Sequence, residues 1–486
     1  MAEFAPLPGD QYPLQFIEHH HAVKLAETDE GVVVGLAAGS SAHLLQTLRV
    51  FHRAPVRFVA VDSTELQSFL GRMLSGDTVS AGGQAPEASE QARLDRLAHD
   101  APIVNLVNSI LIDGIRSGAS DIHVEAFADG VRVRYRIDGV LQTATHVSRD
   151  SFAGISSRLK VMANLNIMER RLPQDGRITV TLLGREFDIR VSIVPIAEGE
   201  SVVLRLFDHS AEGFTLEELG FADEQLAGVR EMLRIPHGLV LVTGPTGSGK
   251  TTTLTAIVRE IESDERKIIT IEDPVEYRVP CIDQIQTNEA IGLTFASLLR
   301  RVLRQDPDVI MVGEIRDAET AGLAIRAALT GHLVLASLHT NNAVSSIARL
   351  VNMGIEPYLV GGVLRGVIAQ RLVRRVCREC GRVGVPSESA RTFFARAVLP
   401  VPTAVPKAVG CAACRSTGYQ GRTAIAEMFT MDRELERVVS GGGDVSSRLN
   451  ERGFRTISEI GLDRVRDGAT TLEEIEHVVL ARRRER

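Results

Sequence analysis

The stretch LVTGPTGSGKTTTL, residues 241–254, decides the fold of the largest part of this chain. It contains the pattern GxxxxGK[ST], formed by Gly244, Gly249, Lys250 and Thr251. The apolar segment GLVLVT precedes the pattern and the segment TTTLTAIVREI, with helical spacing, follows it. A glycine-rich loop between a strand and a helix directs backbone N–H groups and the positive end of the helix dipole toward one point. The stretch therefore predicts a phosphate-binding loop.

The chemistry of the loop assigns roles to its side chains. We expect Lys250 to reach the β- and γ-phosphates of ATP, and the hydroxyl of Thr251 to bind Mg²⁺. The predicted loop comprises Gly244, Pro245, Thr246, Gly247, Ser248, Gly249, Lys250, Thr251 and Thr252. Such a loop binds a nucleotide without necessarily cleaving it, so hydrolysis requires further groups.

Acidic residues follow two other predicted strands. Glu272 ends the segment KIITIE and opens an acidic run that reaches Glu276, and Glu314 follows the segment DVIMVG. Both strand ends should lie at the carboxyl edge of the sheet, where open α/β sheets bind ligands. We assign Glu314 to the Mg²⁺ side and Glu272 to the attacking water. The reverse assignment remains open, as does a purely structural role in capping strand ends or pairing with Arg316.

Two histidines flank the next predicted strand. His332 and His339 stand seven residues apart in TGHLVLASLHT. A single histidine is most often a buried residue satisfied by hydrogen bonds. Two of them beside a phosphate site favour a second role, so we expect His332 and His339 to sense or position the γ-phosphate.

The region around these motifs alternates apolar strands with helical stretches. The strands GLVLVTG, KIITIED, DVIMVGE and HLVLASLH are separated by segments of helical spacing. This alternation is typical of a mostly parallel sheet with helices on both faces. We expect an α/β P-loop core over residues 223–376.

The remaining residues divide into several further units. A chain of 486 residues is too long for one hydrophobic core and predicts three or four domains. Residues 1–75 mix strands such as GVVVGLA and VRFVAV with the helical SAHLLQTLRVF, and residues 101–208 contain strands with turns at Asp129-Gly130 and Asp138-Gly139. We expect a small α/β domain at 1–75, a flexible linker at 76–100, an α+β domain at 101–208, an interdomain linker at 209–222, a tetracysteine subdomain at 377–430 and a helical C-terminal domain at 431–486.

Composition and charge narrow the class of protein. The formal net charge of −7 and the pI near 6.1 argue against a general nucleic-acid binder, which needs a concentrated basic surface. No apolar run is long enough to cross a bilayer, and the beginning of the sequence lacks a basic segment followed by an apolar one. We expect a cytoplasmic protein that has no direct nucleic-acid partner.

Four of the five cysteines form two CxxC pairs. Cys377 and Cys380 lie in VCREC, and Cys411 and Cys414 lie in GCAACRS. Each turn presents two sulfurs to one ion, and two turns complete a tetrahedral site typical of structural Zn²⁺. The thirty residues between the pairs predict a sizeable loop or small subdomain. An Fe–S cluster, or cysteines without metal, remain the alternatives.

The motifs together resemble one known family. GPTGSGKTTTL, ITIEDPVEY, LRQDPDVIMVGEIRD and TGHLVLASLHTN, followed by QRLVRRVCREC, are similar in sequence and order to the secretion ATPases. The chain resembles most the cytoplasmic ATPases of type II secretion, with the type IV pilus assembly ATPases close behind. The resemblance covers residues 101 to about 430, including ASDIHVE, RYRIDG and RLPQDGR.

This resemblance carries several expectations. It implies a RecA-like core preceded by a PAS-like α+β domain, zinc at the cysteines and a homohexamer. In that ring the second domain packs on a neighbouring core and lends arginines to the nucleotide; the matching positions are Arg190 and Arg205. It also implies that the first domain docks on platform proteins of the inner membrane, so that the ATPase is attached there peripherally.

Three functions remain distinguishable at this point. A ring ATPase that powers pseudopilus assembly and protein export is the first, and assembly of type IV pili is its alternative. A DNA translocase and a nucleotide-dependent scaffold with little turnover are the others. The acidic balance and the absence of a nucleic-acid module in the sequence count against DNA.

Overall fold

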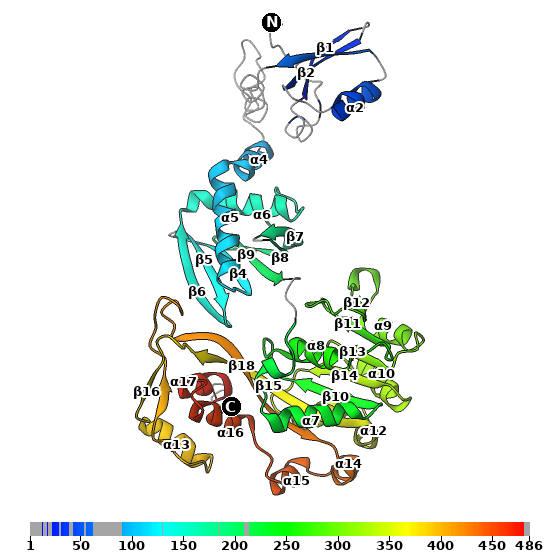
Figure 1. Cartoon of the computed structure of the whole chain (residues 1–486), viewed down its shortest axis with the longest axis vertical. Coiled ribbons are helices and arrows are strands. Elements are labelled where there is room, and N and C mark those ends of the chain that lie inside the picture. Colours follow the sequence, from blue (N-terminus) through cyan, green and yellow to red (C-terminus); the bar gives the residue numbers. More distant parts are fainter. Residues whose placement is uncertain are drawn as a thin grey trace.

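The structure is a computed structural model whose units follow one another along the chain (Figure 1). It describes residues 12, 17, 22–28, 31–37, 42–52, 55–61, 90–128, 130–182, 184–208 and 213–480. The four parts are a first unit (residues 12–61), a second unit (90–208), a core that carries the phosphate-binding loop, and a C-terminal region with the cysteines.

The described part of the first unit contains a three-stranded sheet that packs against a helix. Its elements are β1 (Ala22–Thr28), β2 (Gly31–Ala37), α2 (Ala42–His52) and β3 (Val56–Val61). β1 and β2 are antiparallel, whereas β2 and β3 are parallel and are joined through α2. Val34 of the sheet and Leu48 of the helix are buried between the layers. The predicted small α/β unit is confirmed in the residues described.

A helix lies where we expected the end of a flexible linker. The helix α4 (Glu90–His99) falls within the expected linker 76–100, of which residues 76–89 lie outside the described residues. Leu94 and Ala98, one helical turn apart, are buried where α4 packs on the helices α5 (Ala101–Arg116) and α6 (Arg149–Met162). The prediction is therefore wrong from residue 90 onward, because this short apolar stripe is enough to hold a helix on its neighbour.

The second unit is an antiparallel sheet covered on one face by helices. The strand order is β6-β5-β4-β9-β8-β7. The strands are β4 (Asp121–Phe127), β5 (Gly130–Ile137), β6 (Val140–Val147), β7 (Gln174–Leu182), β8 (Arg185–Ile196) and β9 (Gly199–Asp208), and the helices are α5 (Ala101–Arg116) and α6 (Arg149–Met162). Alternate residues such as Ile122, Val133 and Ile189 are buried with the helices. The other face, here called the open face, carries the polar residues between them.

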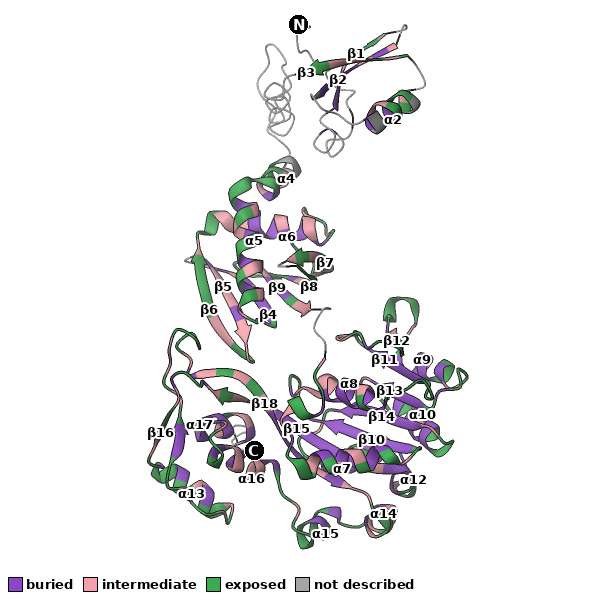
Figure 2. Ribbon diagram, in the orientation of Figure 1, coloured by how far each residue is buried: buried purple, intermediate pink, exposed green. Residues whose placement is uncertain are grey.

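The core contains a seven-stranded sheet in the order β12-β11-β13-β14-β10-β15-β18. Its strands are β10 (Gly238–Thr243), β11 (Ile268–Glu272), β12 (Asp283–Gln286), β13 (Val309–Val312), β14 (Leu333–Leu338), β15 (Leu364–Val376) and β18 (Tyr419–Thr430). All neighbours are parallel except β15 and β18. The parallel α/β core is confirmed, and its central strands are buried throughout (Figure 2).

The strand β18 corrects the expected boundary of the tetracysteine subdomain. We placed residues 377–430 together, but β18 pairs with β15 along the edge of the core sheet. Ala424, Ile425 and Ala426 of β18 are buried in succession. A continuous apolar run of this kind completes a sheet covered on both faces, so β18 belongs to the core.

Helices cover both faces of the core sheet. They are α7 (Asp223–Arg234), α8 (Lys250–Ile261), α9 (Phe295–Val302), α10 (Ala318–Leu329), α11 (Ser345–Asn352) and α12 (Pro357–Val363). One apolar cluster joins the sheet to α7 and α8, and another joins it to α9, α10, α11 and α12. Leu216 and Phe221 are buried in the first cluster, so residues 213–222 pack on the core, contrary to the expected free linker at 209–222.

The C-terminal region does not form one separate helical domain. The cysteine subdomain contains β16 (Arg382–Gly384), α13 (Glu388–Arg396) and β17 (Val405–Lys407), and the following elements are α14 (Arg433–Ser440), α15 (Val445–Glu451), α16 (Ile457–Arg466), α17 (Leu472–Ile475) and η3 (Glu476–Leu480). Side chains of α14 and α15 join the apolar cluster of the core, whereas those of α16 and α17 pack with α13. The described residues of the expected unit 431–486, which end at Leu480, are thus divided between two neighbours, because each half buries its own apolar stripe.

No helix in the described part of the chain is both long and apolar enough to cross a membrane.

Candidate nucleotide site and cysteine cluster

The phosphate-binding loop connects β10 to α8 at the carboxyl edge of the sheet. Gly244, Gly247 and Gly249 all have positive φ angles, of 150°, 76° and 85°. A Cβ atom at Gly244 would lie 2.4 Å from the carbonyl oxygen of Gln370. The pattern of glycines therefore follows from backbone conformation and close approach. Thr246 and Gly247 are exposed at the tip of this loop.

Lys250 begins α8 and its ammonium group lies against the loop. Its Nζ atom donates to the carbonyl oxygens of Gly244 at 3.0 Å and Pro245 at 3.1 Å. Burial lowers the pKa of Lys250, while the charges of Glu314 and Glu276 oppose this shift. The predicted lysine thus stands between the loop and the acidic strand ends. This is a place where the phosphates of a nucleotide find a positive charge.

The side chain of Gln370 supports the loop from below. Its amide nitrogen donates to the carbonyl oxygen of Ser248 at 2.8 Å, and its amide oxygen accepts from the hydroxyl of Thr253 at 2.8 Å. Gln370 lies on β15 and is only 1% exposed. Sequence reasoning missed this residue, because a single glutamine in an apolar strand carries no recognisable spacing. Its only signal is that a buried amide needs polar partners.

The two threonines after Lys250 lie in the first turn of α8, and both are partly buried. Burial raises the pKa of Tyr277, which follows the acidic run, and the side chain of Thr252 partly offsets this shift. Thr251 stands between Lys250 and Thr252, at the positive end of the helix dipole. The position of Thr251 is compatible with the expected Mg²⁺ contact.

Glu272 is a buried carboxyl group at the end of β11, with 2% of its surface exposed. Its Oε1 atom accepts hydrogen bonds from Thr270 at 2.7 Å and Gln284 at 3.0 Å. Its Oε2 atom is buried and has no hydrogen-bond partner among the residues that the structure describes. Burial raises the pKa of Glu272, which the two hydrogen bonds only partly offset. A carboxyl group in this state is suited to accept a proton.

Glu314 is in the opposite electrostatic state. Its Oε1 atom accepts from Arg316 at 2.5 Å, and its Oε2 atom lies 3.1 Å from Nε2 of His339. Burial acts to raise the pKa of Glu314, but Arg316 and His339 outweigh it, so the pKa is lowered. Arg316 also lies 3.6 Å from Asp273. Glu314 is therefore held as a carboxylate, the form that binds the water shell of a cation.

The two histidines lie at opposite ends of β14. His339 follows the carboxyl end and contacts Glu314. His332 precedes the amino end, where its Nδ1 atom lies 2.9 Å from the carbonyl oxygen of Ala327 and its own carbonyl oxygen accepts from Gly238. A six-residue strand spans roughly 20 Å. Within one chain, therefore, only His339 lies at the sheet edge that carries the phosphate loop, and the role expected for His332 stays a prediction.

Arg190 and Arg205 lie side by side on the open face of the second unit. They are directly opposite each other on β8 and β9. Burial and Glu272 raise the pKa of Glu276, whereas the charges of Arg205, Arg190 and Lys250 lower it. The positive field of both arginines thus reaches the acidic run of the same chain. The resemblance to the secretion ATPases implied instead that these arginines act on the nucleotide of a neighbouring subunit.

A turn of the second unit touches the edge of the core. Asp138, in the turn between β5 and β6, accepts a hydrogen bond from the backbone N–H of Gly421 at 2.8 Å. Its carboxylate also lies 3.5 Å from Nε of Arg422. This contact brings the open face of the sheet toward the side of the core that carries the phosphate loop.

The four predicted cysteines form one cluster. Their sulfur atoms all lie within 4.8 Å of one another, with 3.7 Å between Cys380 and Cys414. The Sγ atoms of Cys380 and Cys414 also accept backbone N–H groups, at 3.2 Å from Gly410 and 3.2 Å from Gly418. Four converging sulfurs with N–H donors directed at them fit a structural Zn²⁺ ion. The residues between the two pairs form the predicted small subdomain.

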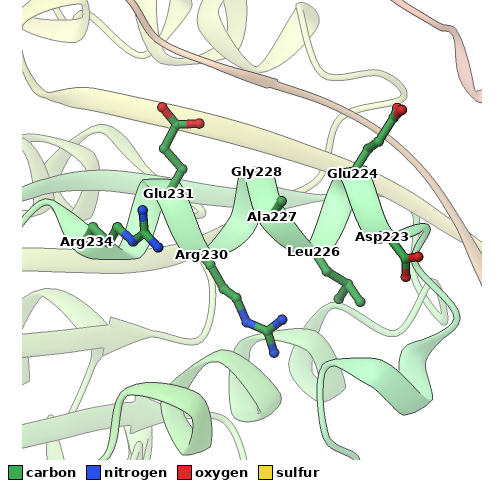
Figure 3. A pocket seen from close by; sticks show the side chains of 8 residues that line it. All are labelled: Asp223, Glu224, Leu226, Ala227, Gly228, Arg230, Glu231 and Arg234. Carbon is green, nitrogen blue, oxygen red and sulfur yellow. The ribbon is translucent and has the colours of Figure 1, made fainter.

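A surface hollow lies along α7, apart from these sites (Figure 3). Every residue that lines it, from Asp223 to Arg234, belongs to that one helix. Acidic side chains stand near the beginning of the helix and Arg234 at its end, which is the usual complement of the helix dipole. None of the predicted site residues lines this hollow.

Comparison with known proteins gives consistent matches. Residues 96–477 match the profile of the family "Type II/IV secretion system protein". The chain is 46% identical to the type II secretion system protein HxcR of Pseudomonas aeruginosa, over 87% of this chain and 89% of that one. It is 42% identical to the type II secretion system ATPase E of Vibrio cholerae, over 91% of each. It is also 43% identical to the type IV pilus assembly ATPase PilB of Myxococcus xanthus, over 86% of this chain and 74% of that one.

Solved structures share the fold. The pilus retraction motor PilT with bound ADP superposes with a TM-score of 0.53 and 26% identity, over 76% of this chain and 95% of that one. The ATPase DotB of Legionella pneumophila gives a TM-score of 0.55 at 21% identity, over 81% of this chain and 97% of that one, which shows a common fold.

Proposed function

Because this chain belongs to the type II/IV secretion system protein family, we propose that it hydrolyses ATP to power protein export by type II secretion. The observation that carries the proposal is the meeting of Lys250, Glu272 and Glu314 at one edge of the core sheet. A positive charge for the phosphates, a proton acceptor and an ionised carboxylate are the minimum set for hydrolysis of a triphosphate.

The residues divide the chemistry among them. Lys250 and the loop N–H groups bind the β- and γ-phosphates, and Thr251 and Glu314 would hold Mg²⁺, which neutralises charge on the phosphates. Glu272 orients the attacking water and takes its proton, because its raised pKa makes it the stronger base. His339 donates to Glu314 and fixes its direction.

Arg190 and Arg205 supply the charge that the core lacks. A guanidinium group near the transferring phosphoryl stabilises the charge that develops there, an effect of roughly 10³ to 10⁵ in rate in related chemistry. Their field at Glu276 supports a position near the nucleotide. We infer that the chain assembles as a homohexamer, in which movement of the second unit brings these arginines to a nucleotide or withdraws them.

The other parts would connect this cycle to a membrane machine. We propose that the first unit docks on cytoplasmic parts of inner-membrane platform proteins, so that the ATPase acts in the cytoplasm at the inner membrane. A Zn²⁺ ion at the four cysteines would be structural, because four protein ligands leave no open position for substrate. Its role is to hold the subdomain between β15 and β18.

Assembly of type IV pili is the second candidate. It is favoured by 43% identity to the pilus assembly ATPase of Myxococcus xanthus, which is close to the identities with the secretion proteins. Both activities require the same hydrolysis, so the nucleotide site does not separate them.

Hydrolysis is tested by phosphate release from the full chain and from Lys250→Ala. We expect the variant to lose at least about 10²-fold in rate, because the main positive charge on the β- and γ-phosphates is removed. Equal release from both proteins would refute the enzymatic proposal.

The biological role is tested in the source bacterium. Deletion of the gene should stop export of secreted enzymes while surface pili persist, and the wild-type gene, but not Lys250→Ala, should restore export. Loss of pili with normal export would assign the chain to pilus assembly.

A further inference from the structure

A row of charged side chains crosses the open face of the second unit. Asp121, at the beginning of β4, is opposite Arg205 on β9 and Arg136 on β5. Arg205 is opposite Arg190 on β8, which in turn is opposite Arg177 on β7. One carboxylate therefore stands in a line with four guanidinium groups.

The carboxylate of Asp121 is buried and fixed from two sides. Only 6% of the residue is exposed. Its Oδ1 atom accepts a hydrogen bond from Nε of Arg205 at 2.9 Å. Its Oδ2 atom accepts from the hydroxyl of Ser120 at 2.8 Å and lies 3.7 Å from Nε of Arg136. A buried carboxylate with both oxygens engaged has little freedom to move, so it offers Arg205 a rigid partner.

The contact between Asp121 and Arg205 uses only one edge of the guanidinium group. The bond is made by Nε, and the side chain of Arg205 is 63% exposed. A guanidinium group carries five N–H donors in a planar fork, so its two terminal nitrogens form a second edge. Holding the Nε edge therefore leaves a bidentate edge for a phosphate. The charge of Arg205 already reaches Glu276 of the nucleotide site.

The neighbouring charges explain why Arg205 needs a holder. Burial and then the like charges of Arg177 and Arg205 lower the pKa of Arg190. Like charges directly opposite each other on a sheet repel, and a long exposed side chain escapes by turning into solvent. An ion pair with one exposed partner contributes little to stability. Its main consequence here is the direction of the guanidinium group.

We propose that Asp121 is a positioning residue for ATP hydrolysis, which holds Arg205 by its Nε edge so that the terminal nitrogens meet the γ-phosphate. This inference rests on the proposed function, since it takes Arg205 to contact the nucleotide. In this role Asp121 contacts neither ATP nor the attacking water, and it acts only through Arg205.

The test compares Asp121→Asn with Glu125→Gln in the full chain. Glu125 lies four residues along the same strand and on the same face, and it binds Arg134 through Nε and a terminal nitrogen of that arginine at 2.9 Å each. We expect Asp121→Asn to lower kcat for ATP roughly tenfold, the size typical of losing an orienting partner, with KM within about twofold. Glu125→Gln should stay within about twofold in both. Size-exclusion chromatography and binding of a fluorescent ATP analogue verify assembly and folding.

A double-mutant cycle with Arg205→Ala separates positioning from structure. If Asp121 acts through Arg205, the double variant is no slower than Arg205→Ala alone. A further tenfold loss in the double variant, or an equal loss in Glu125→Gln, would overturn the proposal. Asp121→Ser enters the same cycle if the asparagine variant does not fold. Normal hydrolysis by Arg205→Ala would refute the role of that arginine, whereas an impaired Arg205→Ala beside a normal Asp121→Asn would refute the positioning role alone.

Discussion

The phosphate-binding loop and the open face of the second unit both carry positive charge, but they are built differently. The loop is a continuous stretch from Gly244 to Thr252. Three of its glycines have positive φ angles, and this conformation lets backbone N–H groups face a phosphate. The open face is assembled from β4, β5, β7, β8 and β9, and its arginines alternate with residues of a buried core.

The difference indicates a division of labour. The core carries the groups that bind the phosphates and hold the metal, so damage there should weaken binding and hydrolysis together. In the function that we propose, the open face carries groups whose charge matters most when charge develops on the transferring phosphoryl. Damage there should spare binding and reduce the rate.

The largest effect confined to the rate should come from Arg190→Ala. We expect kcat to fall by about 10³-fold while the dissociation constant for ATP changes by no more than about twofold, because a guanidinium group acts mainly on the transition state. Single-turnover hydrolysis and equilibrium binding measure the two quantities. Equal losses in both would show that Arg190 is simply part of the binding site.

Arg132→Ala is the matched control for this prediction. Arg132 lies on the same open face. Its guanidinium carbon lies 4.5 Å from the centre of the Phe127 ring, and that of Arg190 lies 5.4 Å from the centre of the Phe207 ring. It stands outside the charged row that contains Arg190. Its removal should leave kcat within about twofold.

A smaller loss should follow from Glu272→Gln, by about 10² in kcat, since general base catalysis contributes on this scale. Burial raises the pKa of Glu272, and the base acts only when it is deprotonated. The rate of the wild type should therefore fall as the pH drops through this raised pKa. The glutamine variant should lose that limb of the pH–rate profile.

The companion variant Glu314→Gln tests the division between the two carboxylates. Arg316 and His339 hold the pKa of Glu314 low, so it stays ionised across the working range. Its replacement should raise the Mg²⁺ concentration needed for half-maximal rate and keep the acid limb. A lost acid limb in Glu314→Gln, with normal Mg²⁺ dependence, would reverse the two assignments.

The same contrast explains what could be predicted from the sequence. The parallel core followed from the alternation of apolar strands and helical stretches, and the acidic residues followed from the ends of those strands. Glu272 and Glu314 lie at the same sheet edge for a topological reason that any parallel sheet obeys. The cysteine cluster could be predicted from the sequence because the two cysteines of each CxxC turn are close together in the chain.

Contacts that depend on strand register or on burial could not be predicted from the sequence. Asp121, Arg136 and Arg205 meet only because β4, β5 and β9 pair in one register. Gln370 is an ordinary strand residue until β15 passes beneath the phosphate loop. The helix α4 and the strand β18 were misassigned because short apolar stripes find their partners through tertiary packing, which local composition does not reveal.

The smallest effect should separate the two histidines, which spacing alone treated as equals. His339→Ala should lower kcat by about tenfold, because Glu314 loses a hydrogen bond to a charged group, and such bonds contribute roughly 1.5–3 kcal/mol. His332→Ala should change the rate by less than about twofold, since His332 caps the end of α10 at the opposite edge of the sheet. The ATP hydrolysis rates of the two full-length variants are compared in the same oligomeric state. A comparable loss in His332→Ala would contradict a nucleotide site built by one chain alone. It would mean that His332, at the opposite edge of the sheet, contacts the nucleotide site of another subunit.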